Sequence, residues 1–257
     1  MYGRINEAVY NGHTWGMSLQ RLLSLNYALL LIIFLLPLRA SAQEPRIQNR
    51  PYLDNRFLHY GFFIGVDMMD LELKNNGFVD PESGEQWYTD VDNYQPGFVV
   101  GVLGELRLNK YLGLRVQPSI HFGQKHLVFH EQLSGRDSTQ NLKSTYLSVP
   151  ISLKIAAPRY NNFRPYFSVG AAPTIDLTTR KHMALRTEAL DCYIEFAAGC
   201  DIYLPYFKLI PELRFSFGLR DILVHERDDL TDATLLKFTK SLDRGTAKMI
   251  TLAFYFE

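Results

Sequence analysis

The residues of this chain that could do chemistry lie near the ends of two segments that we interpret below as strands. These residues are His121, Lys125, His126 and His130 near the end of one segment, Asp67 and Asp70 near the end of another, and His225 further along. An aspartate beside a histidine could activate a water molecule for hydrolysis. No nucleophile motif stands next to them, and residues of these types are common in loops. We therefore expect no catalytic site here.

The sequence also gives no reason to expect a metal or a cofactor. His126 and His130 are four residues apart, a spacing that brings two metal ligands together on a helix and not on a strand. The formal net charge over 257 residues is zero, which leaves no electrostatic footprint for nucleic acid. We expect no metal, no cofactor and no nucleic-acid partner.

The first 42 residues are typical of an N-terminal extension followed by a signal peptide. Arg21 precedes an apolar run over residues 22–36, and Ala40, Ser41 and Ala42 form a small-residue cleavage site. The run is short for a membrane-spanning helix, so a retained anchor is the less favoured alternative. We expect a start at Met17, cleavage after Ala42, a periplasmic segment over residues 43–56 and a barrel domain over residues 57–257.

After residue 56 the dominant pattern is an alternation of apolar and polar residues. In residues 112–122, the apolar series from Leu112 to Phe122 alternates with residues such as Arg115, Gln117 and His121. Successive side chains of a strand point to opposite faces, so this pattern predicts a strand with one apolar and one polar face. Eight such strands are predicted, at residues 60–66, 98–108, 112–122, 147–155, 167–175, 192–202, 208–219 and 249–256.

The connections between these strands distinguish a membrane barrel from a soluble sandwich. We expect short turns at residues 109–110, 157–164 and 205–206, and long polar loops at residues 71–93, 127–141, 178–190 and 221–244. Short turns that alternate with long loops, around strands of about ten residues, are typical of outer-membrane barrels. We predict an all-β, eight-stranded, antiparallel up-and-down transmembrane β-barrel in the outer membrane, with both termini in the periplasm.

The polar faces of the strands carry isolated charges among small residues: Glu105, Arg107, Arg115, Lys154, Glu195, Asp201, Glu212 and Arg214. An eight-stranded barrel has an interior wide enough only for side chains, and buried ions must be paired. We therefore expect a structural network of ion pairs inside the barrel, and neither an active site nor a pore.

Two further residue types have expected places on the barrel. Cys192 and Cys200 would lie roughly 26 Å apart on one strand, too far for a disulfide. Tyrosines at strand ends are expected in the aromatic girdles at the membrane interfaces, although some are simply strand formers. The candidates are Tyr60, Tyr94, Tyr111, Tyr146, Tyr166, Tyr203, Tyr206 and Tyr255.

Three segments resemble a known family. Residues 48–67 read QNRPYLDNRFLHYGFFIGVD, residues 146–155 read YLSVPISLKI, and the chain ends in TLAFYFE. These are similar to the PorT (SprT) family, small outer-membrane barrels of Bacteroidota required for type IX secretion and, in gliding species, for motility. The second segment also occurs in other Bacteroidota barrels of the same superfamily.

The resemblance implies a non-enzymatic accessory component of type IX secretion whose partners are other secretion-system proteins. The alternatives are a generic barrel with a structural or adhesive role through its external loops and, less favoured, an outer-membrane hydrolase. We expect contact with outer-membrane lipid, and with the insertion machinery through the aromatic last strand. Asn49, Pro51 and Asp54 in the periplasmic segment are the favoured contact residues, unless that segment only braces the barrel.

Overall fold

The computed structural model describes residues 49–79, 84–132, 135–178, 187–224 and 241–257. The expected start at Met17, the signal peptide and the cleavage site after Ala42 lie outside these residues and stay predictions. No helix among the described residues is long and apolar enough to cross a membrane.

The described residues form one short 3-10 helix and eleven strand segments in one antiparallel sheet. The elements are η1 (Leu53–Asn55), β1 (Leu58–Asn75), β2 (Trp87–Tyr94), β3 (Pro96–Arg107), β4 (Leu112–Val116), β5 (Ser119–Glu131), β6 (Asp137–Ser148), β7 (Ile151–Ala156), β8 (Phe163–Asp176), β9 (Leu190–Tyr203), β10 (Lys208–Gly218) and β11 (Leu242–Phe256).

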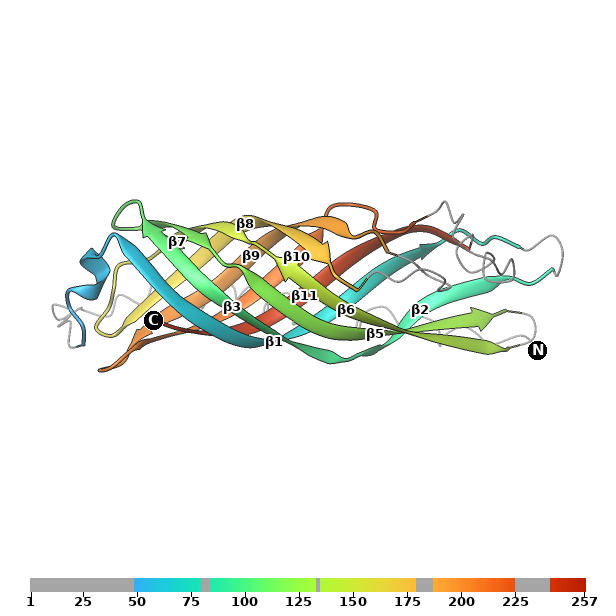
Figure 1. Ribbon diagram of the computed structural model, residues 1–257, viewed down its shortest axis with the longest axis horizontal. Helices are drawn as coiled ribbons and strands as arrows, with labels where there is room; N and C mark the ends of the chain where they lie inside the picture. Colours follow the sequence, from blue (N-terminus) through green and yellow to red (C-terminus); the bar gives the residue numbers. More distant parts are fainter. Residues whose placement is uncertain (1–48, 80–83, 133–134, 179–186, 225–240) are drawn as a thin grey trace, which may run out of the picture. The chain divides into compact units, whose positions relative to one another are not determined.

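The sheet closes on itself, because its first strand pairs with its last and the two edges of the remaining strands also meet. β1 pairs with β11 from Phe62↔Phe256 to Asn75↔Leu242, and with β3 over Leu58–Met68. β8 pairs with both β7 and β9, which joins the two edges of the sheet into a barrel. Figure 1 shows η1 and the C-terminus at one end of the barrel, which we name the turn end; the opposite end is the loop end.

The prediction of eight strands was too low for the number of segments, and prolines are the reason. β2 and β3 are separated at Gln95 before Pro96, β4 and β5 at Pro118, and β6 and β7 at Pro150. A proline has no N–H to donate to the ladder, and each of these three interruptions lies at a proline or next to one. Because the segments of each pair follow each other along one course, the eleven segments occupy eight positions around the barrel.

The outer surface of the barrel near the turn end is apolar. On β1 the side chains of Phe62, Ile64 and Val66 are about half exposed, at 55%, 51% and 49%, while Phe63 between them is buried in the lumen. Exposed apolar side chains recur on β3, β7, β8, β10 and β11. Large exposed apolar areas need an apolar solvent, which the hydrocarbon of a bilayer provides.

The polarity of the two faces reverses toward the loop end. On β1, Met68 is the last exposed apolar residue; Glu72 and Lys74 then point outward, while Met69 and Leu71 are buried. The strands therefore continue beyond the membrane with a water-facing exterior and an apolar interior. The expected loops at residues 71–93 and 127–141 were wrong for this reason: they contain the ends of β1 and β5, β2 up to its last residue, and the start of β6.

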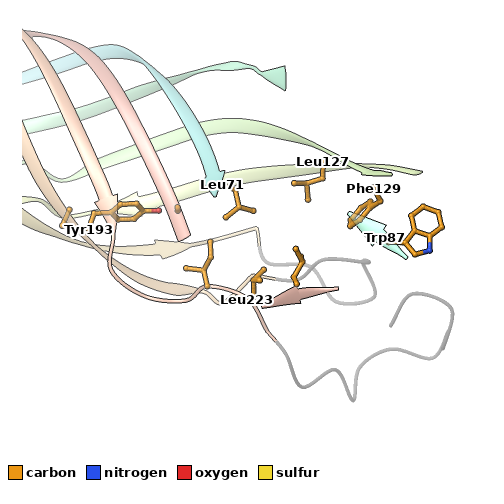
Figure 2. Close-up of a cluster of buried hydrophobic side chains, with 10 residues drawn as sticks. Leu71, Trp87, Leu127, Phe129, Tyr193 and Leu223 are labelled. Atoms are coloured by element: carbon orange, nitrogen blue, oxygen red, sulfur yellow. The ribbon is translucent and has the colours of Figure 1, made fainter. Parts of the chain in front are cut away.

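The buried apolar side chains of this extension form a cluster inside the barrel at the loop end. Figure 2 shows Leu71 of β1, Leu127 and Phe129 of β5, Trp87 of β2 and Leu223 gathered there. All five are at most 6% exposed. The cluster stabilises the extension in the same way as the hydrophobic core of a soluble protein, because it removes apolar surface from water.

A charge on the lipid-facing wall should destabilise the barrel. Ile151 of β7 is 49% exposed on that wall, and we expect Ile151→Arg to cost about 2–4 kcal/mol because the guanidinium would contact hydrocarbon. Thr139→Arg on β6, at an exposed position of the extension, is the control and should change little. Unfolding of the reconstituted barrel in urea measures both, and equal stability of the two variants would contradict the assignment of the lipid face.

Candidate functional site

The lumen at the level of the apolar wall is filled by an ion-pair network centred on Arg115. This side chain is completely buried, and its Nε lies 2.7 Å from Glu105 Oε2 while its Nη1 lies 2.8 Å from Glu212 Oε2. β4 positions Arg115 inward because Leu114 and Val116, on either side of it, face outward. A guanidinium with two carboxylates in bonding geometry is the arrangement in which a buried charge is stable.

Two further cations extend this network in opposite directions. The Nζ of Lys154 lies 2.8 Å from Asp201 Oδ2, toward the turn end. Arg214 Nη2 lies 2.8 Å from Glu212 Oε1, and its Nη1 lies 3.6 Å from Glu195. The predicted network is therefore confirmed for seven of the eight expected charges. The eighth, Arg107, lines a small cavity at the turn end.

Four tyrosines expected in the membrane girdles point into the lumen instead: Tyr146, Tyr166, Tyr203 and Tyr255 are at most 7% exposed. Their hydroxyl groups bind the charges of the lumen. Tyr166 donates to Glu212 at 2.6 Å, and its ring lies under the guanidinium of Arg115 at 4.4 Å. The exposed side chains that a girdle requires are found at Tyr60, Tyr111 and Tyr206. The side chain of Tyr94 is outside the described residues.

Asp67, His121 and Ser119 form a hydrogen-bonded chain in the middle of the lumen. His121 Nδ1 lies 2.8 Å from Asp67 Oδ2, and Ser119 Oγ lies 3.2 Å from His121 Nε2. This order of groups matches that of a serine nucleophile with its base and orienting carboxylate. All three side chains are at most 3% exposed, and neither cavity described at the two ends of the lumen includes them.

The other candidate residues for chemistry lie apart from one another and form no common site among the described residues. Lys125 donates to the hydroxyl of Tyr146 inside the barrel, whereas His126 and His130 lie on the outer face and bind Asn141 and Asp137 separately. The described residues contain no group of three or more potential metal ligands. Asp70 accepts from the neighbouring backbone N–H of Leu71, and His225 lies outside the described residues.

The segment before β1 is clamped onto the turn end by the residues of its family-like motif. The side-chain amide of Asn49 donates to the Tyr203 carbonyl at 2.9 Å. The carboxylate of Asp54 accepts from Arg159 at 3.1 Å and from the hydroxyl of Tyr203. Arg159 also stacks on the ring of Tyr203, 3.5 Å from its centroid. The segment thus braces the barrel.

The first and last strands are joined at the same end by ionic contacts that the sequence analysis missed. His59 of β1 lies 2.5 Å from the carboxylate of Glu257, which also pairs with Lys208. All three side chains are at most 6% exposed. The alternation of the strand predicts that Lys208 faces the lumen. The sequence contains no pattern that predicts its ion pair with Glu257.

The space left in the lumen is small. A cavity of about 10 Å³ lies at the turn end between Asp54, Lys154, Asp201 and Lys208, and one of the same volume lies near Tyr146 and Asp191. Volumes of this size are at the limit of what one water molecule needs. Each of these two cavities therefore holds at most about one water molecule, and buried ion-paired side chains occupy the lumen between them.

The closed antiparallel sheet, the apolar exterior and the ion-paired lumen together define an outer-membrane β-barrel. A family model described as "Outer membrane protein beta-barrel domain" matches residues 42–224, and the chain belongs to that family. The protein is located in the outer membrane. A comparison with curated proteins gave no match.

Solved structures with similar folds are also outer-membrane proteins. Ail, the attachment invasion locus protein of Yersinia pestis, is 16% identical, with 77% of this chain and 97% of that chain covered and a TM-score of 0.33. OprG from Pseudomonas aeruginosa is 12% identical, with 77% and 93% covered and a TM-score of 0.38. AlkL is 13% identical, with 82% and 96% covered and a TM-score of 0.35. These scores are too low for inference about function.

Removing the central cation of the lumen should destabilise the barrel strongly. Arg115→Met removes the cation shared by Glu105 and Glu212 and leaves each buried carboxylate with one fewer partner, so we expect a loss of about 3–5 kcal/mol. Lys74→Met is the control, because its ion pair with Asp243 is exposed and contributes about 0–1 kcal/mol. Urea unfolding followed by the gel mobility of the folded barrel measures both. Parent-like stability of Arg115→Met would contradict the structural role of the network.

Proposed function

We propose that this protein is a non-enzymatic outer-membrane barrel that acts through its surfaces as an accessory or assembly component of type IX protein secretion, and of gliding motility where it occurs. The observation that carries the proposal is the filled lumen: side chains joined by ion pairs leave no passage for a protein. The resemblance of residues 48–67 to the PorT family supports the secretion role.

The clamped segment at the turn end is the surface that we favour for contact with other secretion-system proteins. The family-like residues Asn49 and Asp54 fix it in one conformation through buried contacts with the barrel. Leu53 of the segment is buried, whereas Tyr52 beside it is 81% exposed. A rigid, exposed aromatic residue is a common anchor in protein interfaces, because little conformational entropy is lost on binding.

The absence of catalysis is part of the proposal. Ser119 and His121 have the geometry of a nucleophile and its base, but a substrate would have to enter a packed lumen to reach them. The chain of Asp67, His121 and Ser119 is better explained as mutual satisfaction of buried polar groups.

A second candidate function is a generic barrel that binds a molecule outside the cell through its loop end. The observation that favours it is an ion-pair link among the described residues of that end. Arg136 joins Glu85 and Glu131, and its hydrogen bonds to these two carboxylates raise the pKa of the Arg136 guanidinium. With the apolar cluster beneath it, the extension is a firm platform for binding.

Export of cargo bearing the type IX C-terminal signal in a deletion strain tests the secretion role. We expect export to stop in the deletion strain and to return with the parent gene and with Ser119→Ala. Tyr52→Ala should assemble normally but export less cargo, because it removes the exposed aromatic of the clamped segment.

Tyr206→Ala is the matched control for this experiment, since Tyr206 is 90% exposed in the turn before β10 at the same end. It should export cargo as the parent does. Heat-dependent gel mobility of each variant shows whether the barrel has assembled. Normal export in the deletion strain would refute the secretion role and favour the second candidate.

A further inference from the structure

The wall of the barrel has a seam between β1 and β2, just beyond the lipid-facing band. The ladder between β1 and β3 ends at Met68↔Pro96, and β2 pairs with β5 but, among the described residues, not with β1. The edge of β1 from Met69 to Lys74 therefore faces β2 without a ladder. On its other edge β1 is paired with β11 along the same stretch, so β1 is held in place.

Among the described side chains, that of Asn75 closes the far end of this seam. The amide of Asn75 donates to the Thr89 carbonyl at 3.1 Å and accepts from the Thr89 N–H at 2.9 Å. These two bonds reproduce one rung of an antiparallel ladder with a side chain in place of a backbone. Asn75 thus works as a latch between β1 and β2. The ladder is interrupted at Gln95, before Pro96, and β2 can bend there.

Behind the seam lies the apolar cluster of the loop end. Leu71 and Trp87 belong to the two strands that flank the seam, and Leu127 and Phe129 lie next to them on β5 (Figure 2). Met69, at the membrane-side end of the seam, packs against Gly123. A space opened among such side chains would offer water no hydrogen-bond partners, whereas apolar molecules occupy spaces of this kind readily.

We propose that the seam between β1 and β2 is a latched side entrance through which the alkyl chain of a single-chain amphiphile passes from the adjoining leaflet into the apolar cluster. The entrance begins at Met68, which is the last exposed apolar residue of β1, so an alkyl chain reaches it without crossing water. A single-chain amphiphile fits better than a phospholipid, because one chain can turn upward without drawing a second chain out of the bilayer. This inference is independent of the secretion role.

Quenching of Trp87 fluorescence tests the proposal. The sequence contains two tryptophans, so Trp15→Phe leaves Trp87 as the only reporter. The full chain in phosphatidylcholine vesicles receives brominated stearate, whose bromine atoms quench a tryptophan on contact. Asn75→Ala removes both latch bonds, and we expect the open state to be populated on the order of tenfold more, with stronger quenching as a result. Asn141→Ala, which removes an exposed bond to His126 on the paired β5–β6 ladder, is the matched control and should behave as the parent.

A disulfide staple supplies the opposite test. With Cys192→Ala and Cys200→Ala as background, Asn75→Cys combined with Thr89→Cys should abolish quenching when oxidised and restore it when reduced. If Asn75→Ala fails to assemble, the comparison of the oxidised and reduced staple still tests whether the seam opens to alkyl chains. Acrylamide, a polar quencher, should gain little access to Trp87 in Asn75→Ala, and vesicles of brominated phosphatidylcholine should quench less than brominated stearate.

Three outcomes would overturn the proposal. Equal quenching by brominated stearate in the parent, Asn75→Ala and the stapled chain would show that the seam does not open to alkyl chains. A rise in acrylamide quenching without a rise in stearate quenching would show a water-filled opening. Quenching by brominated phosphatidylcholine equal to that by stearate would show that the occupant is an ordinary membrane lipid.

Discussion

The structure depends on one constraint, that backbone N–H and C=O groups surrounded by hydrocarbon must find partners within the protein. The chain satisfies it by closing its sheet through the pairing of β8 with β9 and of β1 with β11. Prolines are tolerated because neighbouring groups compensate: the N–H of Gln117 donates to the Pro150 carbonyl, and that of Val149 to the Pro173 carbonyl. Within the lipid-facing band, closure leaves no strand edge unpaired.

Closure with eight positions also determines the chemistry of the lumen. The interior is too narrow for bulk water, so each charge that faces inward must meet another charge or a hydroxyl group. Arg115, Glu212 and Tyr166 show the result, a cation between carboxylates with a tyrosine ring stacked on it. The packing that stabilises the barrel also fills its interior, and this is the basis for the proposal that the protein acts through its surfaces.

The sequence predicted the membrane-level strands well, because alternation is strict where one face meets lipid and the other meets the lumen. The sequence-based prediction was wrong at the loop end. Between Met68 and Leu71 the apolar side chains change from the outer face to the inner face, and the pattern then predicts loops where the structure has strands. The inward charges were foreseen, but their pairing was not, since Arg115 and Glu212 are 97 residues apart. The chain of Asp67, His121 and Ser119 and the Asn75 latch depend on register between strands, which periodicity does not specify.

The most direct test of the account is the electrical conductance of the purified barrel in a planar lipid bilayer. With folded insertion confirmed by heat-dependent gel mobility, a barrel whose lumen is filled by ion-paired side chains should show no stepwise current at any applied voltage. Discrete current steps that scale with voltage would reveal an aqueous channel, and would contradict the proposal that this protein acts through its surfaces.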